Sequence, residues 1–340
     1  MLRKSFRDFD EFAESIAGIE GRFVPTAPSA ADWWVQGTQA NRVSVQVLQV
    51  GGCATFAGTG QHDRIAVGLP MTDARRMCID ATALREDCYI LMQGPQPFIF
   101  TGTGPTQWAG ITLPSDHPIL DPSTLQILGA TDSVRTRTQL EYLVYFRGLV
   151  NRALSLDPTV NFATPIAAAA LDQDISLAVA RVLQMSCEDR DIRREYLRAH
   201  HARAIARCLE LMKASRGQMQ FIEDLVHAAQ VSERTLRTLF QAYFGVSPMR
   251  LLKAKQLWEV RAALLNRQSG EGVIQIAGRF GFWDASLFAH NYKALFGELP
   301  SETLQSPVNA SRRDASLSWL IFAARTFRAQ AGTSGDKRRR

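Results

Sequence analysis

The chain has 340 residues, of which 46% are hydrophobic and 21% are charged, a composition typical of a soluble protein with two or three domains. It has no run of about 18 apolar residues, so we expect no membrane-spanning helix, and residues 1–7 lack the apolar stretch of a signal peptide. The five cysteines are widely spaced without a CxxC pair, which favours free thiols in a cytoplasmic protein over disulfides or a zinc site.

Charge is divided unevenly along the chain. Residues 1–200 carry 18 Lys and Arg against 22 Asp and Glu, a net charge of −4, whereas residues 201–340 carry 21 against 11, a net charge of +10. A basic C-terminal half attracts polyanions such as the phosphate backbone of DNA. The chain ends in the basic run 337–340, for which we expect a disordered tail that either adds nonspecific attraction or has no role.

Residues 23–120 show the pattern of short strands. Residues 43–50 alternate between apolar and polar with period two, and apolar runs follow at 88–92 and 97–101. Glycines at 51–52, 58–60 and 102–104 are interpreted as turns. This pattern predicts a small antiparallel sheet or barrel.

Aromatic residues in this region could line an effector pocket, although most aromatics in a small barrel belong to its core. The candidates are Trp33, Trp34, Tyr89, Phe98, Phe100 and Trp108. A metalloenzyme is the alternative, but His62 and His117 are the only histidines between residues 23 and 120, and they do not form a metal-binding pair. With no nucleophile motif present either, we expect no catalytic residue, metal or cofactor.

From residue 132 onward the apolar period becomes helical. We expect helices at 135–152 and 172–185, which are candidates for a homodimer interface, and a further helix at 193–214.

A repeat follows, because residues 240–248 recur as residues 292–300 at an offset of 52. In the first copy, residues 221–229 predict a short helix with Phe221, Leu225, Ala228 and Ala229 on its apolar face. Ser232 is suited to cap a second helix, and Gly245 is suited to end it. Two short helices joined by a tight turn are the helix-turn-helix plan, in which the second helix enters the major groove of DNA.

Polar side chains lie outside the apolar stripe of this second helix, and all can bond to bases or phosphates. These candidate DNA-binding residues are Arg234, Thr235, Arg237, Thr238 and Gln241. In the second copy Gly281 makes the turn, Asp284 caps the helix, and the outward residues are Ala285, Ser286, Ala289, His290 and Lys293. Residues 248–265 predict a connecting helix of roughly 27 Å, so the two units can meet successive major grooves roughly 34 Å apart.

Residues 221–304 resemble the DNA-binding domain of the AraC/XylS family of bacterial transcription regulators. The resemblance is carried by Ile276-Ala277, Gly281-Phe282, Phe288, Tyr292-Lys293, Phe296-Gly297 and Pro300-Ser301. It implies a regulator that binds promoter DNA, with base contacts at Arg234, Arg237 and Thr238 in the first unit and at Ala285, Ser286, Ala289 and His290 in the second. The segments 281–283 and 288–304 are also similar to ethanolamine-operon regulators.

This chain departs from the family at position 290, which is often arginine in relatives, and its alanines at 285 and 289 offer only methyl groups. We therefore expect the first unit to supply most of the hydrogen-bonded base readout. The resemblance also implies an activator that contacts RNA polymerase, near Glu298 or Glu302. The alternative is an effector-independent regulator whose N-terminal half serves only for dimerisation or protein contacts.

The expected fold class is α+β, with an N-terminal β-barrel or sheet followed by helices and then an all-α domain with two helix-turn-helix units. We expect a β-rich sensor domain at 1–130, a helical dimerisation or linker region at 131–200, the DNA-binding domain at 201–305 and a C-terminal extension at 306–340. Within the extension, residues 317–327 predict an additional helix, which we expect to pack on the DNA-binding domain.

Overall fold

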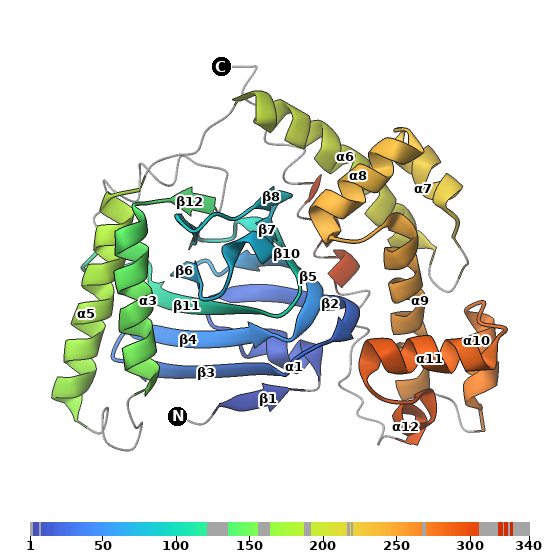
Figure 1. The fold of residues 1–340 in the computed structure, drawn as a ribbon, viewed down its shortest axis with the longest axis horizontal. Coiled ribbons are helices and arrows are strands. Elements are labelled where there is room, and N and C mark those ends of the chain that lie inside the picture. Colours follow the sequence, from blue (N-terminus) through green and yellow to red (C-terminus); the bar gives the residue numbers. More distant parts are fainter. Residues whose placement is uncertain are drawn as a thin grey trace.

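The computed structural model describes residues 3–6, 8–120, 135–155, 164–186, 192–215, 218, 220–266, 270–305, 319–321, 323–325 and 327–328. The fold is α+β, as the sequence predicts: strands dominate the N-terminal half, and helices follow (Figure 1). No helix in these ranges is both long and apolar enough to span a membrane.

The N-terminal half consists of two antiparallel sheets. The larger sheet has the strand order β1-β3-β4-β11-β6-β9-β12 and the smaller sheet the order β2-β5-β10-β7-β8. The strands of the larger sheet are β1 (Lys4–Phe6), β3 (Trp33–Ala40), β4 (Val43–Val50), β6 (Arg64–Pro70), β9 (Cys88–Gln93), β11 (Thr106–Pro114) and β12 (Arg135–Arg137). Those of the smaller sheet are β2 (Ile19–Ser29), β5 (Gly52–Gly60), β7 (Met77–Ile79), β8 (Thr82–Ala83) and β10 (Pro97–Thr103), and the short helix α1 (Phe9–Glu14) precedes β2.

Helices cover the outer faces of both sheets (Figure 1). α3 (Leu140–Ser155) and α5 (Pro165–Gln184) pack on the larger sheet, and the remaining helices lie on the side of the smaller sheet. These are α6 (Ile192–Ala214), α7 (Ile222–Ala229), α8 (Glu233–Phe244), α9 (Pro248–Leu265), α10 (Val273–Arg279), α11 (Ala285–Phe296) and α12 (Pro300–Gln305).

Three clusters of buried apolar residues fill the spaces between these layers. One fills the space between the two sheets, and a second joins the larger sheet to α3 and α5. The third contains Val24, Ala57 and Ile99 of the smaller sheet together with residues of α6 to α11. The alternation of side chains along each strand gives both sheets two apolar faces, so the helical domain packs directly against the sheet domain.

The structure corrects three local expectations. The segment 58–60 is not a turn but the end of β5, because Gly58 lies so close to β2 that an added Cβ would come within 2.4 Å of the Glu20 carbonyl oxygen. Of the segment 102–104, Gly102 belongs to β10, and only Gly104 follows the strand. Residues 135–137 form an edge strand on β9 rather than the start of a helix, and α3 begins at Leu140.

α6 runs through residue 200, where we expect a domain boundary, without a break. Its residues Ala202, Ile205, Leu209 and Met212 are buried in the cluster formed by the C-terminal helices. The described cysteines, Cys53, Cys78, Cys88 and Cys208, are free thiols, and Cys187 lies outside the described residues.

Candidate nucleic-acid interface

The first repeat forms two helices whose ends are fixed by the expected caps. The Ser232 hydroxyl accepts a hydrogen bond from the Thr235 amide at 3.2 Å, which satisfies one of the free N–H groups at the start of α8. Gly245 ends α8 in the left-handed conformation with φ +67°. The apolar face of α7 differs from the expectation at Phe221, which precedes the helix and is 54% exposed. The buried face of α7 is formed by Leu225 and Ala229.

The candidate DNA-binding residues of α8 lie on its accessible side. Four are exposed and Thr235 is intermediate. Arg237 pairs with Glu233 one turn earlier, Nη2 to Oε1 at 2.5 Å, and Thr238 donates to the Arg234 carbonyl at 3.0 Å. Gln241 donates to the Gly245 carbonyl at 3.1 Å. These are local surface contacts that DNA can replace, because exposed i,i+4 pairs contribute only a few tenths of a kcal/mol.

The second repeat has the same construction. The Asp284 carboxylate accepts from the Leu287 amide at 2.9 Å, and Gly297 ends α11 with φ +75°. Ala285, Ser286, His290 and Lys293 are exposed and Ala289 is intermediate, while the opposite side of α11 buries Phe288, Tyr292 and Leu295.

The helix α9 joins the two units as a single rod of 18 residues, with the bounds expected from the sequence (Figure 1). It begins at Pro248 after the capping hydroxyl of Ser247 and is held by the second unit through Trp258, whose ring packs edge-on against Phe296. Lys255 and Glu259 form an ion pair at 3.0 Å whose side chains are 5% and 4% exposed. Leu251 and Leu252, near the start of α9, are buried in one cluster with residues of α8, so buried contacts with both units limit rotation of one unit relative to the other.

A buried polar network closes the second unit. The Tyr292 hydroxyl donates to Thr303 Oγ1 at 2.8 Å, and Thr303 in turn donates to Glu298 at 2.6 Å. Glu298 also pairs with Arg261 of α9 at 2.8 Å. Burial raises the pKa of Tyr292 to about 12.

This pKa predicts a loss of stability at high pH. The folded protein holds the Tyr292 proton more tightly than the unfolded chain, where tyrosine titrates near 10, so this contribution is complete below pH 10 and is lost as the pH rises toward 12. Between pH 9 and 11 the free energy of unfolding should fall by about 1 kcal/mol more in the unmodified protein than in Tyr292→Phe. Urea unfolding measures the difference, and parallel pH curves would contradict it. Tyr145→Phe, at a tyrosine that is 51% exposed, is the control.

One exposed apolar surface at the second unit is missing from our sequence analysis. Trp283 is 84% exposed, Ile274 71% and Leu287 53%. Trp283 and Ile274 border a hollow of about 190 Å³ that also includes Ala285 and Ala289, two of the candidate base-contacting residues. A tryptophan between the turn glycine and the cap of a recognition helix is the signal that could have indicated it.

The sheet domain contains an apolar cavity of about 80 Å³. Of the six aromatic residues considered for a pocket, Phe98, Phe100 and Trp108 line this cavity, together with Phe23 and Phe56. Trp33, Trp34 and Tyr89 are buried but do not line it. His62 is exposed in a turn, whereas His117 pairs with Asp172 of α5 at 3.3 Å. Within the described residues, no group of three acidic, His or Cys side chains could hold a metal ion.

Comparison with known proteins places the repeat in a recognised domain family. Residues 225–306 match the helix-turn-helix domain. Over 84 residues, the chain is 37% identical to XylDLEGF operon transcriptional activator 2 of Pseudomonas putida, an alignment that covers 24% of this chain and 54% of that protein. The chain thus spans about half or less of the length of the curated relatives it matches.

Two solved structures are also similar to this chain. A transcriptional regulator with an AraC-type DNA-binding domain from Chromobacterium violaceum is 26% identical, with a TM-score of 0.28 over 30% of this chain and 88% of that one. ToxT from Vibrio cholerae is 13% identical, with a TM-score of 0.26 over 78% of this chain and 99% of that one.

Proposed function

We propose that this protein is a sequence-specific DNA-binding transcription regulator of the AraC/XylS type, and specifically an activator. The proposal rests on one observation: two helix-turn-helix units with the same caps are held on one rigid helix, and their outward residues are accessible. The match of residues 225–306 and the identity to a transcriptional activator support it. The similarity of segments 281–283 and 288–304 to ethanolamine-operon regulators stays a prediction.

Each monomer reads two successive major grooves in this proposal. The 18 residues of α9 span roughly 27 Å at the rise of an α-helix. With α8 and α11 at its two ends, the recognition helices can reach grooves roughly 34 Å apart on one face of DNA. Base contacts come from Arg234, Arg237 and Thr238 in α8, and α11 contributes methyl, phosphate and shape contacts.

The test is to map bound sites genome-wide and to footprint the strongest of them with purified full-length protein. Each monomer should protect two half-sites whose centres are about 10–10.5 base pairs apart, and affinity should fall steeply with salt because phosphate contacts release counterions. A single protected half-site per monomer, or binding without sequence preference, would contradict the proposal. The genes beside the sites would identify the pathway.

We infer that the sheet domain binds a small apolar effector in its cavity. The cavity is lined almost entirely by apolar and aromatic side chains, which suits an uncharged or largely hydrocarbon ligand. Its small volume is the observation behind a second candidate, a regulator without an effector. Calorimetric titration of the full chain with a panel of apolar metabolites separates the two, since the second candidate gives no binding heat across the panel.

A homodimer fits the exposed apolar side chains of α3 and α5, which share the outer side of the larger sheet. These are Leu140, Val144, Tyr145, Ile166 and Leu177. A two-fold interface over this pair of helices would bring four recognition helices to two sites. Of the two candidate contacts with RNA polymerase, we favour Glu302, because it is exposed. Glu298 pairs with Arg261 and accepts a hydrogen bond from Thr303.

A further inference from the structure

Strands β2, β5 and β10 separate the cavity from the helix-turn-helix domain. Side chains alternate along each strand, so one face of these strands lines the cavity with Phe23, Phe56, Phe98 and Phe100. The opposite face carries Val24, Ala57 and Ile99, which are buried with the residues of the helical domain. We call these three strands the shared sheet. A single layer of backbone therefore lies between the cavity and the helical domain.

The shared sheet bonds to one particular point of the helical domain, the last turn of α8. Thr101 Oγ1 donates to the Tyr243 carbonyl at 2.5 Å, and Thr55 Oγ1 donates to the Phe244 carbonyl at 3.3 Å. Both threonines are buried, with exposures of 3% and 0%. The last carbonyls of a helix have no partner within the helix, so these two hydroxyls take the place of a C-terminal cap.

Among the described residues, no such hydrogen bond is found at the last turn of α11, although α11 also contacts β2 of the shared sheet. A Cβ added to Gly245 would lie 3.0 Å from Thr101 Cγ2, whereas one added to Gly297 would meet no atom within 4 Å. Both glycines have positive φ, so the difference between them is the neighbouring sheet and not the helix end. Phe296 packs instead within its own domain, against Trp258.

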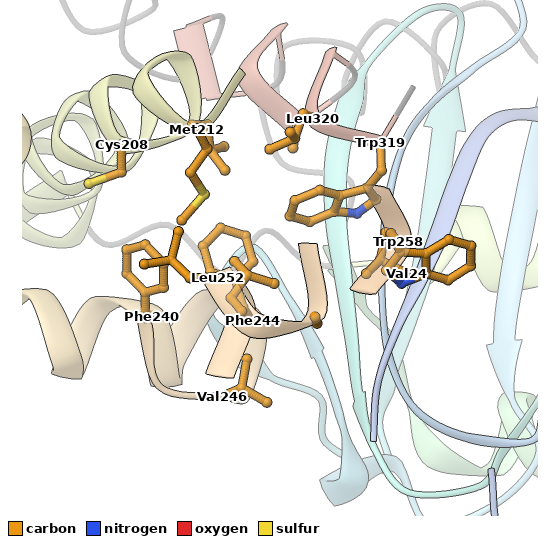
Figure 2. Packing of buried hydrophobic residues seen from close by; sticks show 14 of the residues in the cluster. Val24, Cys208, Met212, Phe240, Phe244, Val246, Leu252, Trp258, Trp319 and Leu320 are labelled. Atoms are coloured by element: carbon orange, nitrogen blue, oxygen red, sulfur yellow. The ribbon is translucent and has the colours of Figure 1, made fainter. Parts of the chain in front are cut away.

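Apolar packing extends the contact on the far side of the same turn. Phe244 packs against Trp319 and Phe327 of the C-terminal extension, and Tyr243 against Phe327. Figure 2 shows Phe244 between Leu252 and the extension residues Trp319 and Leu320. The last turn of α8 is thus enclosed, and a displacement of the sheet must be taken up by the helix.

The cavity leaves little room for a ligand beside the rings of the shared sheet. Its volume of about 80 Å³ is roughly half that of the ~150 Å³ cavity that accepts benzene. A ligand of more than a few atoms that enters this cavity therefore presses on its lining, which includes the rings of Phe56, Phe98 and Phe100. Each ring is next in sequence to a residue that faces α8, since Thr55, Ile99 and Thr101 are their neighbours.

We propose that the Thr55 and Thr101 contacts with the last turn of α8 transmit occupancy of the cavity to the first helix-turn-helix unit and leave the last turn of α11 unaffected. The proposal rests on the effector-responsive function proposed above and specifies its regulation. It makes the arginine-bearing recognition helix α8 the controlled one.

The experiment measures amide hydrogen exchange in the full-length protein without DNA, so its outcome is independent of whether the protein binds DNA. Gly110→Leu replaces the ligand: Gly110 lines the cavity, and a Cβ added there would meet no atom within 4 Å. We expect amides 242–246 to exchange about 2- to 10-fold faster in Gly110→Leu, the factor associated with loss of one hydrogen bond, and amides 294–298 to be unchanged.

Isosteric variants test the contact itself, including the case in which Gly110→Leu does not fold. Thr101→Val should increase exchange at 242–246 by the same factor, and Gly110→Leu should add little to the Thr55→Val/Thr101→Val double variant. The control is Thr112→Val. Thr112 lies on the larger sheet, is also buried, and donates to the carbonyl of Ala17. Unchanged exchange at 242–246 in Thr101→Val, or equal changes at both helix ends in either variant, would overturn the proposal.

Discussion

Replacing Arg237 with alanine is expected to weaken binding to the cognate site by roughly 5- to 100-fold. An arginine that bonds bidentately to guanine discriminates by about 1–3 kcal/mol. The competing pair with Glu233 lies on the surface, with side chains 64% and 48% exposed, so exchanging it for a base costs little. Ser286→Ala should change affinity only a few-fold, because the second unit depends less on hydrogen bonds. Footprint titrations on both half-sites measure the two losses separately.

Two further variants identify the cause of the loss. Arg237→Lys retains the charge but not the planar fork, so it should recover nonspecific affinity without recovering specificity at the first half-site. Arg75→Ala removes the same charge from an exposed position in the sheet domain and should leave both half-sites unchanged. Equal losses of specificity from Arg237→Ala and Ser286→Ala would contradict the unequal roles of the two units.

Glu259→Leu is expected to destabilise the protein by about 3–5 kcal/mol. Lys255 and Glu259 are almost fully buried in the middle of α9, and removal of one partner leaves the other charge without compensation in a medium that solvates it poorly. In this variant the Lys255 ammonium still donates to the Ser215 carbonyl at 3.4 Å, which does not replace the lost carboxylate charge. Urea unfolding of the full chain measures the loss, and DNA affinity should fall with the folded fraction.

The double variant Lys255→Met/Glu259→Leu should regain most of this stability, because two apolar side chains of similar size remove both charges together. Asp116→Ala is the surface control, since it breaks the exposed pair with Arg42 and should cost less than about 1 kcal/mol. A double variant as unstable as the single one would show that packing at these positions, and not charge, holds α9.

The local signals of the repeat are sufficient to predict its structure. The residues that begin or end its helices act on backbone groups within about one turn, so the local sequence pattern is enough to predict their effect. These residues are Ser232, Gly245, Pro248 and Asp284. The start of α9 follows directly from Gly245 and Pro248. Accessibility of the recognition residues follows too, because they alternate with a buried stripe of large apolar residues.

Features that depend on distant parts of the chain could not be predicted in this way. Gly58 resembles a turn residue in sequence, but the approach of β2 decides its conformation. Phe221 has the right spacing for the apolar face, yet α7 begins one residue later. The bonds from Thr55 and Thr101 join residues 189 and 142 positions apart, and neither threonine has a local pattern that indicates them.

The burial of the extension against α8 has a consequence for synthesis. Trp319 and Phe327 complete the apolar surroundings of Phe244 in the first unit. Within the described part of the chain, the aromatic contacts of the second unit join residues 258–296, and Trp258 also contacts Phe9. Because a chain leaves the ribosome from its N-terminus, the second unit can finish its core while the first still lacks these side chains. The unit translated first is therefore the last to mature, and ribosomes that stop early release a protein whose defect lies in its arginine-bearing reader.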